Sequence, residues 1–103
     1  MSIPQQGDVW WAETEHKRRP VLVITRSEAT PVLTRVVVAP ISRTVRGIPT
    51  EIGLGSSEGL PSECAASFDN LQTILRSALT ERAGALGLRR GEICDTLHAL
   101  ADC

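Results

Sequence analysis

Two segments of the chain place guanidinium and hydroxyl groups beside apolar runs that are typical of strands. Arg18, Arg19 and Pro20 lead directly into the apolar residues 21–25, and the segment 40–51 (Pro-Ile-Ser-Arg-Thr-Val-Arg-Gly-Ile-Pro-Thr-Glu) follows the next apolar run. An Arg side chain offers a planar fork of donors that is always charged, which suits the nonbridging oxygens of a phosphodiester, and Ser and Thr add hydroxyl donors. The spacing therefore predicts an anion site at the ends of two strands, with ordinary solvated loop arginines as the alternative interpretation.

The elements that position these groups are expected to be mostly strands. Apolar runs broken by turn residues predict strands at 7–12, 21–25, 34–39, 50–54, 63–68 and 71–74. Residues 21–24 are continuously apolar, as in a strand that is covered on both faces. Pro20 suits the beginning of a strand, where a missing amide donor is tolerated. The charged segment 13–18 is the expected loop between the first two strands.

The last quarter of the chain changes to a helical period. Apolar residues recur at i, i+4 and i+7: Ile93, Leu97 and Leu100. They predict an amphipathic helix from about residue 88, capped only by Gly87. Arg89 and Arg90 lie unfavourably near the positive end of its dipole, so a frayed first turn is expected. Together the patterns predict a small, curved, mostly antiparallel barrel closed by a C-terminal helix.

Composition narrows the class of protein. A chain of 103 residues with 42% hydrophobic content is expected to form one domain. It has no run as long as a membrane span and no signal-peptide pattern at its N-terminus, so a cytoplasmic protein is expected. The net charge of −1 argues against nonspecific coating of nucleic acid. Residues 1–50 nevertheless hold seven Lys and Arg against four acids, so a polyanion is expected to meet the loops of the first half.

The three cysteines, two histidines and two tryptophans carry weaker signals. The cysteines lack CxxC spacing, so neither a disulfide framework nor a zinc site is indicated. Cys64 and Cys94 are expected to be buried, with Cys103 a terminal thiol. Trp10 and Trp11 point to opposite faces of a strand, so one is expected in the core and the other at an interface or a base-stacking position.

The motifs taken together resemble the MazF/PemK family, the toxin endoribonucleases of bacterial type II toxin–antitoxin systems. The matching pieces, in order, are Gly7-Asp8-Val9-Trp10-Trp11, Arg19-Pro20, Pro40-Ile41-Ser42, Gly47-Ile48-Pro49-Thr50-Glu51 and Phe68-Asp69-Asn70-Leu71-Gln72-Thr73-Ile74. The resemblance runs from residue 7 to the C-terminus. It implies one toxin domain over residues 1–103 with an SH3-like (CcdB/PemK-type) antiparallel barrel. It also implies a homodimer and a MazE-like antitoxin whose acidic, disordered tail crosses the basic groove.

The same resemblance implies a reaction on RNA. The 2′-hydroxyl attacks the adjacent phosphorus in line, which leaves a 2′,3′-cyclic phosphate and a 5′-hydroxyl and requires neither metal nor cofactor. Arg19 matches the family's Arg before Pro, a residue implied to contact the scissile phosphate. We expect it to stabilise the transition state and to act as the acid, because its pKa is too high for a base. The base stays unassigned, and a two-histidine mechanism with His16 and His98 is not expected.

Ser42 stands where the family most often has Thr, whose hydroxyl donates to the phosphate. The hydroxyl is kept and the methyl that stiffens χ1 is lost, so retained but slower cleavage is expected. Thr44 is the alternative phosphate donor. The expected RNA-binding residues are Arg18, Arg43, Thr44, Arg46, Asp69 and Asn70, although Asp69 and Asn70 also suit a turn between strands. The alternative function is a barrel toxin that does not cut, either a gyrase-poisoning relative or a module that only binds RNA.

Overall fold

The computed structural model describes residues 3–15 and 17–101, and this part of the chain forms a curled sheet with a C-terminal helix. The strands are β1 (Asp8–Glu13), β2 (Arg18–Val23), β3 (Arg35–Ser42), β4 (Glu51–Leu54), β5 (Cys64–Ser67), β6 (Gln72–Leu75) and β7 (Leu79–Ala85). The helices are α1 (Glu92–Leu100) and the 3₁₀-helices η1 (Ser56–Glu58), η2 (Phe68–Asn70), η3 (Arg76–Ala78) and η4 (Gly87–Gly91). No helix among the described residues has the length and apolarity of a membrane span.

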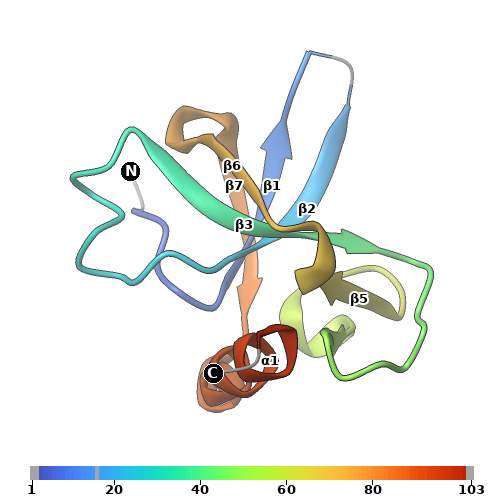
Figure 1. The fold of residues 1–103 in the computed structure, drawn as a ribbon. Helices are drawn as coiled ribbons and strands as arrows, with labels where there is room; N and C mark the ends of the chain where they lie inside the picture. Colours follow the sequence, from blue (N-terminus) through green and yellow to red (C-terminus); the bar gives the residue numbers. More distant parts are fainter. Residues whose placement is uncertain (1–2, 16, 102–103) are drawn as a thin grey trace.

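The strands follow the order β4-β5-β3-β2-β1-β7, and every recorded pairing is antiparallel. β3 is the long central strand: Val38 pairs with Val23 of β2 on one side and with Gln72 of β6 on the other. The far end of β3 pairs instead with β5, so β6 and β5 follow one another along the same edge of β3. The sheet thus bends into a half-barrel, with the β1–β2 hairpin at one end and α1 at the other (Figure 1). The predicted mainly β antiparallel fold with a C-terminal helix is confirmed.

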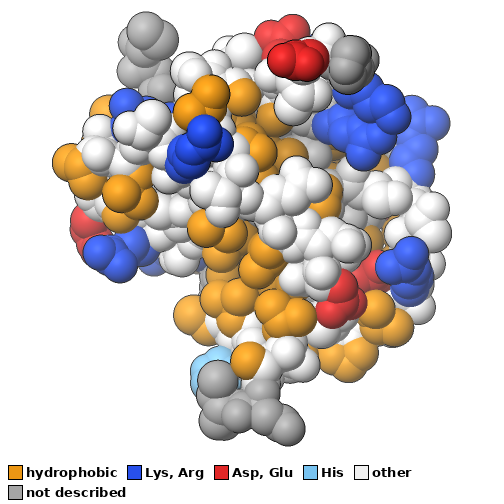
Figure 2. Space-filling view, turned by 45° about the horizontal axis from the view of Figure 1, so that its top comes forward, with side chains coloured by type: hydrophobic (Ala, Val, Ile, Leu, Met, Phe, Trp, Pro, Cys, Tyr) orange, Lys and Arg blue, Asp and Glu red, His pale blue; other side chains and the backbone are white. Residues whose placement is uncertain are grey.

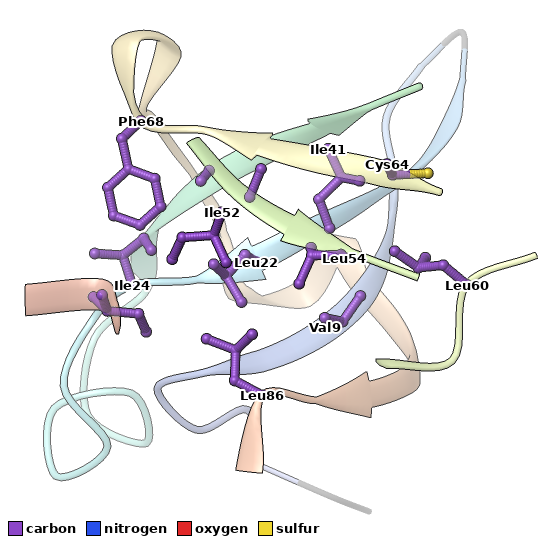
Figure 3. Close-up of a cluster of buried hydrophobic side chains, with 13 residues drawn as sticks. Val9, Leu22, Ile24, Ile41, Ile52, Leu54, Leu60, Cys64, Phe68 and Leu86 are labelled. Carbon is purple, nitrogen blue, oxygen red and sulfur yellow. The ribbon is translucent and has the colours of Figure 1, made fainter. Parts of the chain in front are cut away.

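Both faces of this curled sheet are covered by apolar side chains. One cluster lies inside the curl, where side chains of β1, β2, β3, β4 and β5 point toward one another (Figure 3): Val9, Leu22, Ile24, Ile41, Ile52, Leu54, Leu60, Cys64, Phe68 and Leu86. The second cluster lies on the opposite face: Trp10, Ala12, Val21, Val23, Val36, Val38 and Leu79. Alternate residues of 21–24 enter the two clusters, which confirms the prediction of a strand covered on both faces. Each fully buried side chain of Leu, Val or Phe contributes about 1.5–3 kcal/mol.

The half-barrel is held together where the η1 turn meets β7, a junction called the seam below. A close backbone contact and one arginine join the two sides of this seam. The η1 turn lies so close to β7 that a Cβ on Gly59 would overlap the carbonyl oxygen of Ala83, and a Cβ on Gly84 would overlap that of Glu58. Glu58 is 4% exposed and accepts from the Gly55 N–H at 2.8 Å.

Arg89 links η4 to three neighbours at this seam. Its guanidinium donates to the Gly53 carbonyl at 2.8 Å, to Glu58 at 3.3 Å and to Glu92 at 2.7 Å. The hydrogen bond from Arg89 lowers the pKa of the Glu92 carboxyl below its ordinary value. The seam therefore depends on two glycines and on one shared cation.

The strand β7 is absent from the sequence prediction. Its sequence, LTERAGA, is poor in β-branched residues and contains two alanines and a glycine, which are weak strand formers. The segment becomes a strand because it pairs with β1, with Trp11 opposite Glu81 and Val9 opposite Gly84. A pairing between segments about seventy residues apart leaves no local signal.

The C-terminal helix exists as predicted, but its beginning and its buried face differ. The prediction of a helix capped by Gly87 was wrong, because residues 87–91 form the 3₁₀-helix η4 and α1 begins after its N-cap Gly91. The expected fraying of the first turn stays a prediction. The helix buries Ile93 and Thr96, whose hydroxyl donates to the Glu92 carbonyl at 2.7 Å. Leu100, predicted on the same face, is 40% exposed.

Of the two cysteines predicted to be buried, one is buried and one is exposed. Cys64 is buried, which confirms the prediction, whereas Cys94 is exposed on α1, so the prediction that it is buried was wrong. Only one side of α1 packs against the sheet, and Ile93 lies on that side. The next residue, Cys94, is rotated away from the sheet. Cys103 and His16 lie outside the described residues. Trp10 is in the core and Trp11 on the other face, as the alternation predicts.

Candidate functional site

The register between β2 and β3 brings the two main candidate residues to the same place. Val21 pairs with Pro40, and the next positions that share this face of the sheet are Arg19 and Ser42. At this point β3 leaves β2 and pairs with β5, so the sheet opens beside the two side chains. Arg19 and Ser42, 23 positions apart in the sequence, therefore lie on the same face of the sheet where β2 and β3 separate.

A cleft of about 290 Å³ opens here. It is lined by Arg19, Pro40, Ile41, Ser42, Thr44, Arg46, Glu51, Ala65, Ser67, Asn70 and Gln72. Of the eight residues that the sequence singles out for the site, the structure brings five into this cleft: Arg19, Ser42, Thr44, Arg46 and Asn70. In the space-filling view, basic side chains gather at the upper right and again at the lower right, the lower group beside acidic side chains, and others lie at the left of the face (Figure 2).

The Ser42 hydroxyl is oriented by the backbone that follows it. The N–H of Thr44 donates to Ser42 Oγ at 3.1 Å, which uses an acceptor position of the hydroxyl. The hydroxyl proton remains available as a donor, because a hydroxyl carries one proton and two lone pairs. Both residues are exposed, so a ligand in the cleft can reach them.

The two cleft arginines present unshared positive charge. Arg19 and Arg46 are exposed, and neither guanidinium makes a hydrogen bond or ion pair with another described residue. A guanidinium in this state meets an incoming phosphate without first giving up an intramolecular partner. The cleft therefore combines two arginines without described partners and one oriented hydroxyl donor, a composition that suits an anionic ligand.

Arg18 lies on the opposite face of β2 from Arg19. Its guanidinium donates to Glu81 at 3.0 Å and lies 4.6 Å from the centre of the Trp11 ring. The alternation of side chains along a strand turns Arg18 away from the cleft when Arg19 faces it. Arg43 is exposed beside the cleft without lining it.

Asp69 and Asn70 belong to η2 (Phe68–Asn70), the turn between β5 and β6. Asp69 accepts a hydrogen bond from the Thr50 hydroxyl at 2.6 Å and does not line the cleft. Asn70 lines it while its amide donates to Ser67 Oγ at 3.0 Å.

Three polar residues of the cleft were not predicted as site residues. Glu51, Ser67 and Gln72 come from β4, β5 and β6, whose existence is predicted but whose pairing is not. Gln72 also borders a smaller adjoining pocket of about 50 Å³, which extends the cleft toward Thr14 and Lys17. Among the described residues, no three His, Cys, Asp or Glu side chains are grouped as a metal site would require.

The comparison with known proteins agrees with the resemblance in the sequence. The family model for the PemK-like, MazF-like toxin of type II toxin–antitoxin systems matches residues 5–102. The probable endoribonuclease MazF5 of Mycobacterium tuberculosis (strain ATCC 25618 / H37Rv) is 37% identical over 105 residues, covering 99% of this chain and 96% of that protein.

Solved structures of toxins and endoribonucleases share this fold. The Mycobacterium tuberculosis toxin MazF-mt6 has a TM-score of 0.84 at 35% identity, covering 92% of this chain and 96% of that one. A mycobacterial endoribonuclease in complex with its cognate antitoxin shares the fold, with a TM-score of 0.78 at 22% identity, covering 93% and 92%. The chain therefore belongs to the family of PemK-like, MazF-like toxins of type II toxin–antitoxin systems.

Proposed function

We propose that this toxin is a sequence-specific endoribonuclease that cleaves single-stranded RNA without a metal ion or cofactor and thereby inhibits translation and growth. The observation that carries the proposal is the meeting of Arg19 and Ser42 in one cleft, with unshared charge and an oriented hydroxyl. The name of the relative MazF5 as a probable endoribonuclease supports the same activity.

The cleft residues suit attack by the 2′-hydroxyl on the adjacent phosphorus. As the bond from phosphorus to the 5′-oxygen breaks, negative charge accumulates on the phosphoryl oxygens and on the leaving oxygen. The 2′-hydroxyl passes its proton to the unassigned base as it attacks. Arg19 stabilises the charge and supplies a proton to the 5′-oxygen, Ser42 donates to a nonbridging oxygen, and the base and Arg19 return to their starting protonation states by exchange with water. The products are a 2′,3′-cyclic phosphate and a 5′-hydroxyl.

RNA on either side of the scissile phosphate would follow the cleft. Arg46, which lines the cleft, and Lys17, which lines the adjoining pocket, suit backbone phosphates. Asn70 and Gln72 offer amide groups that can read the polar edges of splayed bases. Arg43, beside the cleft, stays a predicted backbone contact. The engagement of Arg18 with Glu81 and of Asp69 with Thr50 favours structural roles for those two residues.

The partners follow from the family. A mycobacterial relative was solved with its cognate antitoxin, which supports neutralisation of this toxin by a MazE-like antitoxin. We propose that the toxin acts as a homodimer in the cytoplasm. An acidic antitoxin tail would compete with RNA for the same arginines, because both are polyanions.

The test is cleavage of a long mixed-sequence RNA by the purified toxin in EDTA, with cut sites and end groups mapped. We expect discrete cuts at a recurring short sequence that leave 5′-hydroxyl and 2′,3′-cyclic phosphate ends, and we expect the cuts to disappear in Arg19→Ala. Cleavage that requires an added divalent metal would refute the metal-independent mechanism. A folded toxin that binds RNA and cuts none of several RNA classes would favour the non-cutting barrel toxin.

A second test separates the two hydroxyls near the phosphate. Ser42→Ala is expected to lower kcat by about 10²-fold, the effect of removing one preorganised donor. Thr44→Val should lower kcat much less, because Val keeps the shape of Thr and keeps the backbone N–H that orients Ser42. Ser42→Thr should match or exceed the wild-type kcat, because the added methyl restricts χ1. Single-turnover cleavage of a short RNA measures all three, and the reverse order of the first two would assign the phosphate contact to Thr44.

A further inference from the structure

We infer that Glu51 is the positioning residue of the toxin's phosphate site: its carboxylate anchors the loop between β3 and β4 and so places Thr44 and Arg46 in the cleft. Glu51 Oε1 accepts from two consecutive backbone N–H groups, those of Arg46 at 2.9 Å and of Gly47 at 3.2 Å. The inference rests on the proposed function, because it concerns the same cleft.

The loop needs such an anchor because little else holds it. Residues 43–49 are exposed and belong to no strand. Gly47 has a φ of +68°, a conformation that glycine adopts without the strain of a side chain and that turns its N–H toward the carboxylate. Two further hydrogen bonds involve backbone N–H groups at the ends of this loop. The Thr44 N–H donates to Ser42 Oγ, and the Glu51 N–H donates to the Ile48 carbonyl at 3.1 Å.

The anchor itself is fixed to the sheet. Glu51 is the first residue of β4 and pairs with Ser67 of β5. The preceding residue, Thr50, donates through its hydroxyl to Asp69 at 2.6 Å and accepts at its carbonyl from the Phe68 N–H at 2.9 Å. Asp69 thus contributes to the cleft from a distance, by holding the strand end that carries the Glu51 carboxylate.

The negative charge of Glu51 lies in the cleft that is proposed to take a polyanion, so its presence requires a reason. Two N–H donors on one carboxylate oxygen offset part of that charge, and the charge strengthens both hydrogen bonds. What the loop requires is the acceptor oxygen and not the charge. Glutamine keeps a carbonyl oxygen at the same reach, whereas methionine keeps the length of the side chain without an equivalent acceptor.

These two substitutions form the test. We expect Glu51→Gln to retain kcat within about threefold, with an equal or lower KM because one repulsive charge is removed. Glu51→Met should lower kcat by tenfold to about a hundredfold, the effect of a small misplacement of catalytic groups. Glu63→Gln is the matched control, because Glu63 is exposed and does not line the cleft. All variants are compared with the wild-type toxin on the same RNA.

A second readout does not depend on activity. Amide hydrogen exchange of Arg46 and Gly47, followed by NMR in the free toxin, should be slow in the wild type and in Glu51→Gln and fast in Glu51→Met. If the wild type does not cleave RNA, the proposed function fails while this exchange pattern still tests the anchor. Equal loss of kcat in both variants, or unchanged exchange in Glu51→Met, would overturn the inference.

Discussion

Replacing Arg19 with alanine is expected to lower kcat for RNA cleavage by about 10²–10³-fold, while the toxin stays folded. The magnitude is that of losing one preorganised donor to a transition-state oxyanion. The fold should tolerate the change because the Arg19 side chain is exposed and makes no hydrogen bond or ion pair with another described residue. Circular dichroism and size-exclusion chromatography check the fold and assembly, and single-turnover cleavage measures the loss.

The neighbouring arginine supplies a matched control. Arg18→Ala removes the same side chain one position away, on the opposite face of β2, where it contacts Glu81 and Trp11. It should leave kcat within about twofold and change the free energy of unfolding by less than about 1 kcal/mol, as is usual for exposed ion pairs. Arg19→Lys should recover only part of the lost kcat, because an ammonium group lacks the planar fork. Equal losses in the two alanine variants would contradict the assignment of Arg19 to the cleft.

Replacing Gly84 with alanine is expected to lower the free energy of unfolding by about 3 kcal/mol, the upper part of the usual range for overpacking. The new Cβ would overlap the carbonyl oxygen of Glu58, so β7 and the η1 turn would have to separate. Gly59→Ala should cost at least as much, since its Cβ would overlap the Ala83 carbonyl and its φ of +83° is unfavourable for a side chain. A loss of this size lowers the melting temperature of a domain near 100 residues by roughly 12–24 °C.

Gly91→Ala is the control for these two variants. Gly91 has a φ of −59° and no atom within 4 Å of an added Cβ, so alanine should stabilise the toxin by about 0.4–1 kcal/mol. Thermal and urea denaturation of the three variants measure the differences. A Gly84→Ala variant as stable as the wild type would show that the half-barrel can open at this seam without cost.

The local sequence patterns predict most of the elements because their signals are short in range. A continuous apolar run at 21–24 predicts a strand covered on both faces, and alternate residues do enter two separate clusters. The period of Ile93 and Leu97 predicts a helix that packs on the sheet. β7 has no such signal, because its alanines and glycine form a strand only against β1.

For the candidate site too, the sequence predicts the residues but not how they come together. Arg19 and Ser42 can be named from the sequence, because each belongs to a short motif whose residue types suit a phosphate. Their meeting depends on the register of β2 and β3, which motif residues do not determine by themselves. Arg18 and Arg19 have the same side chain, and only the pleat of β2 decides which of them faces the cleft.

The sequence by itself determined the family, the mostly β fold and the pair of residues proposed for catalysis, because motif order and apolar period are properties of the chain alone. The tertiary structure decided which arginines share the cleft, that Asp69 supports a strand end, and that Glu51 anchors the loop. These contacts join β3, β4 and the turn after β5, segments that are distant or weakly patterned in sequence. A side chain acquires such a partner only when strand pairing and the bend of β3 bring the two segments together.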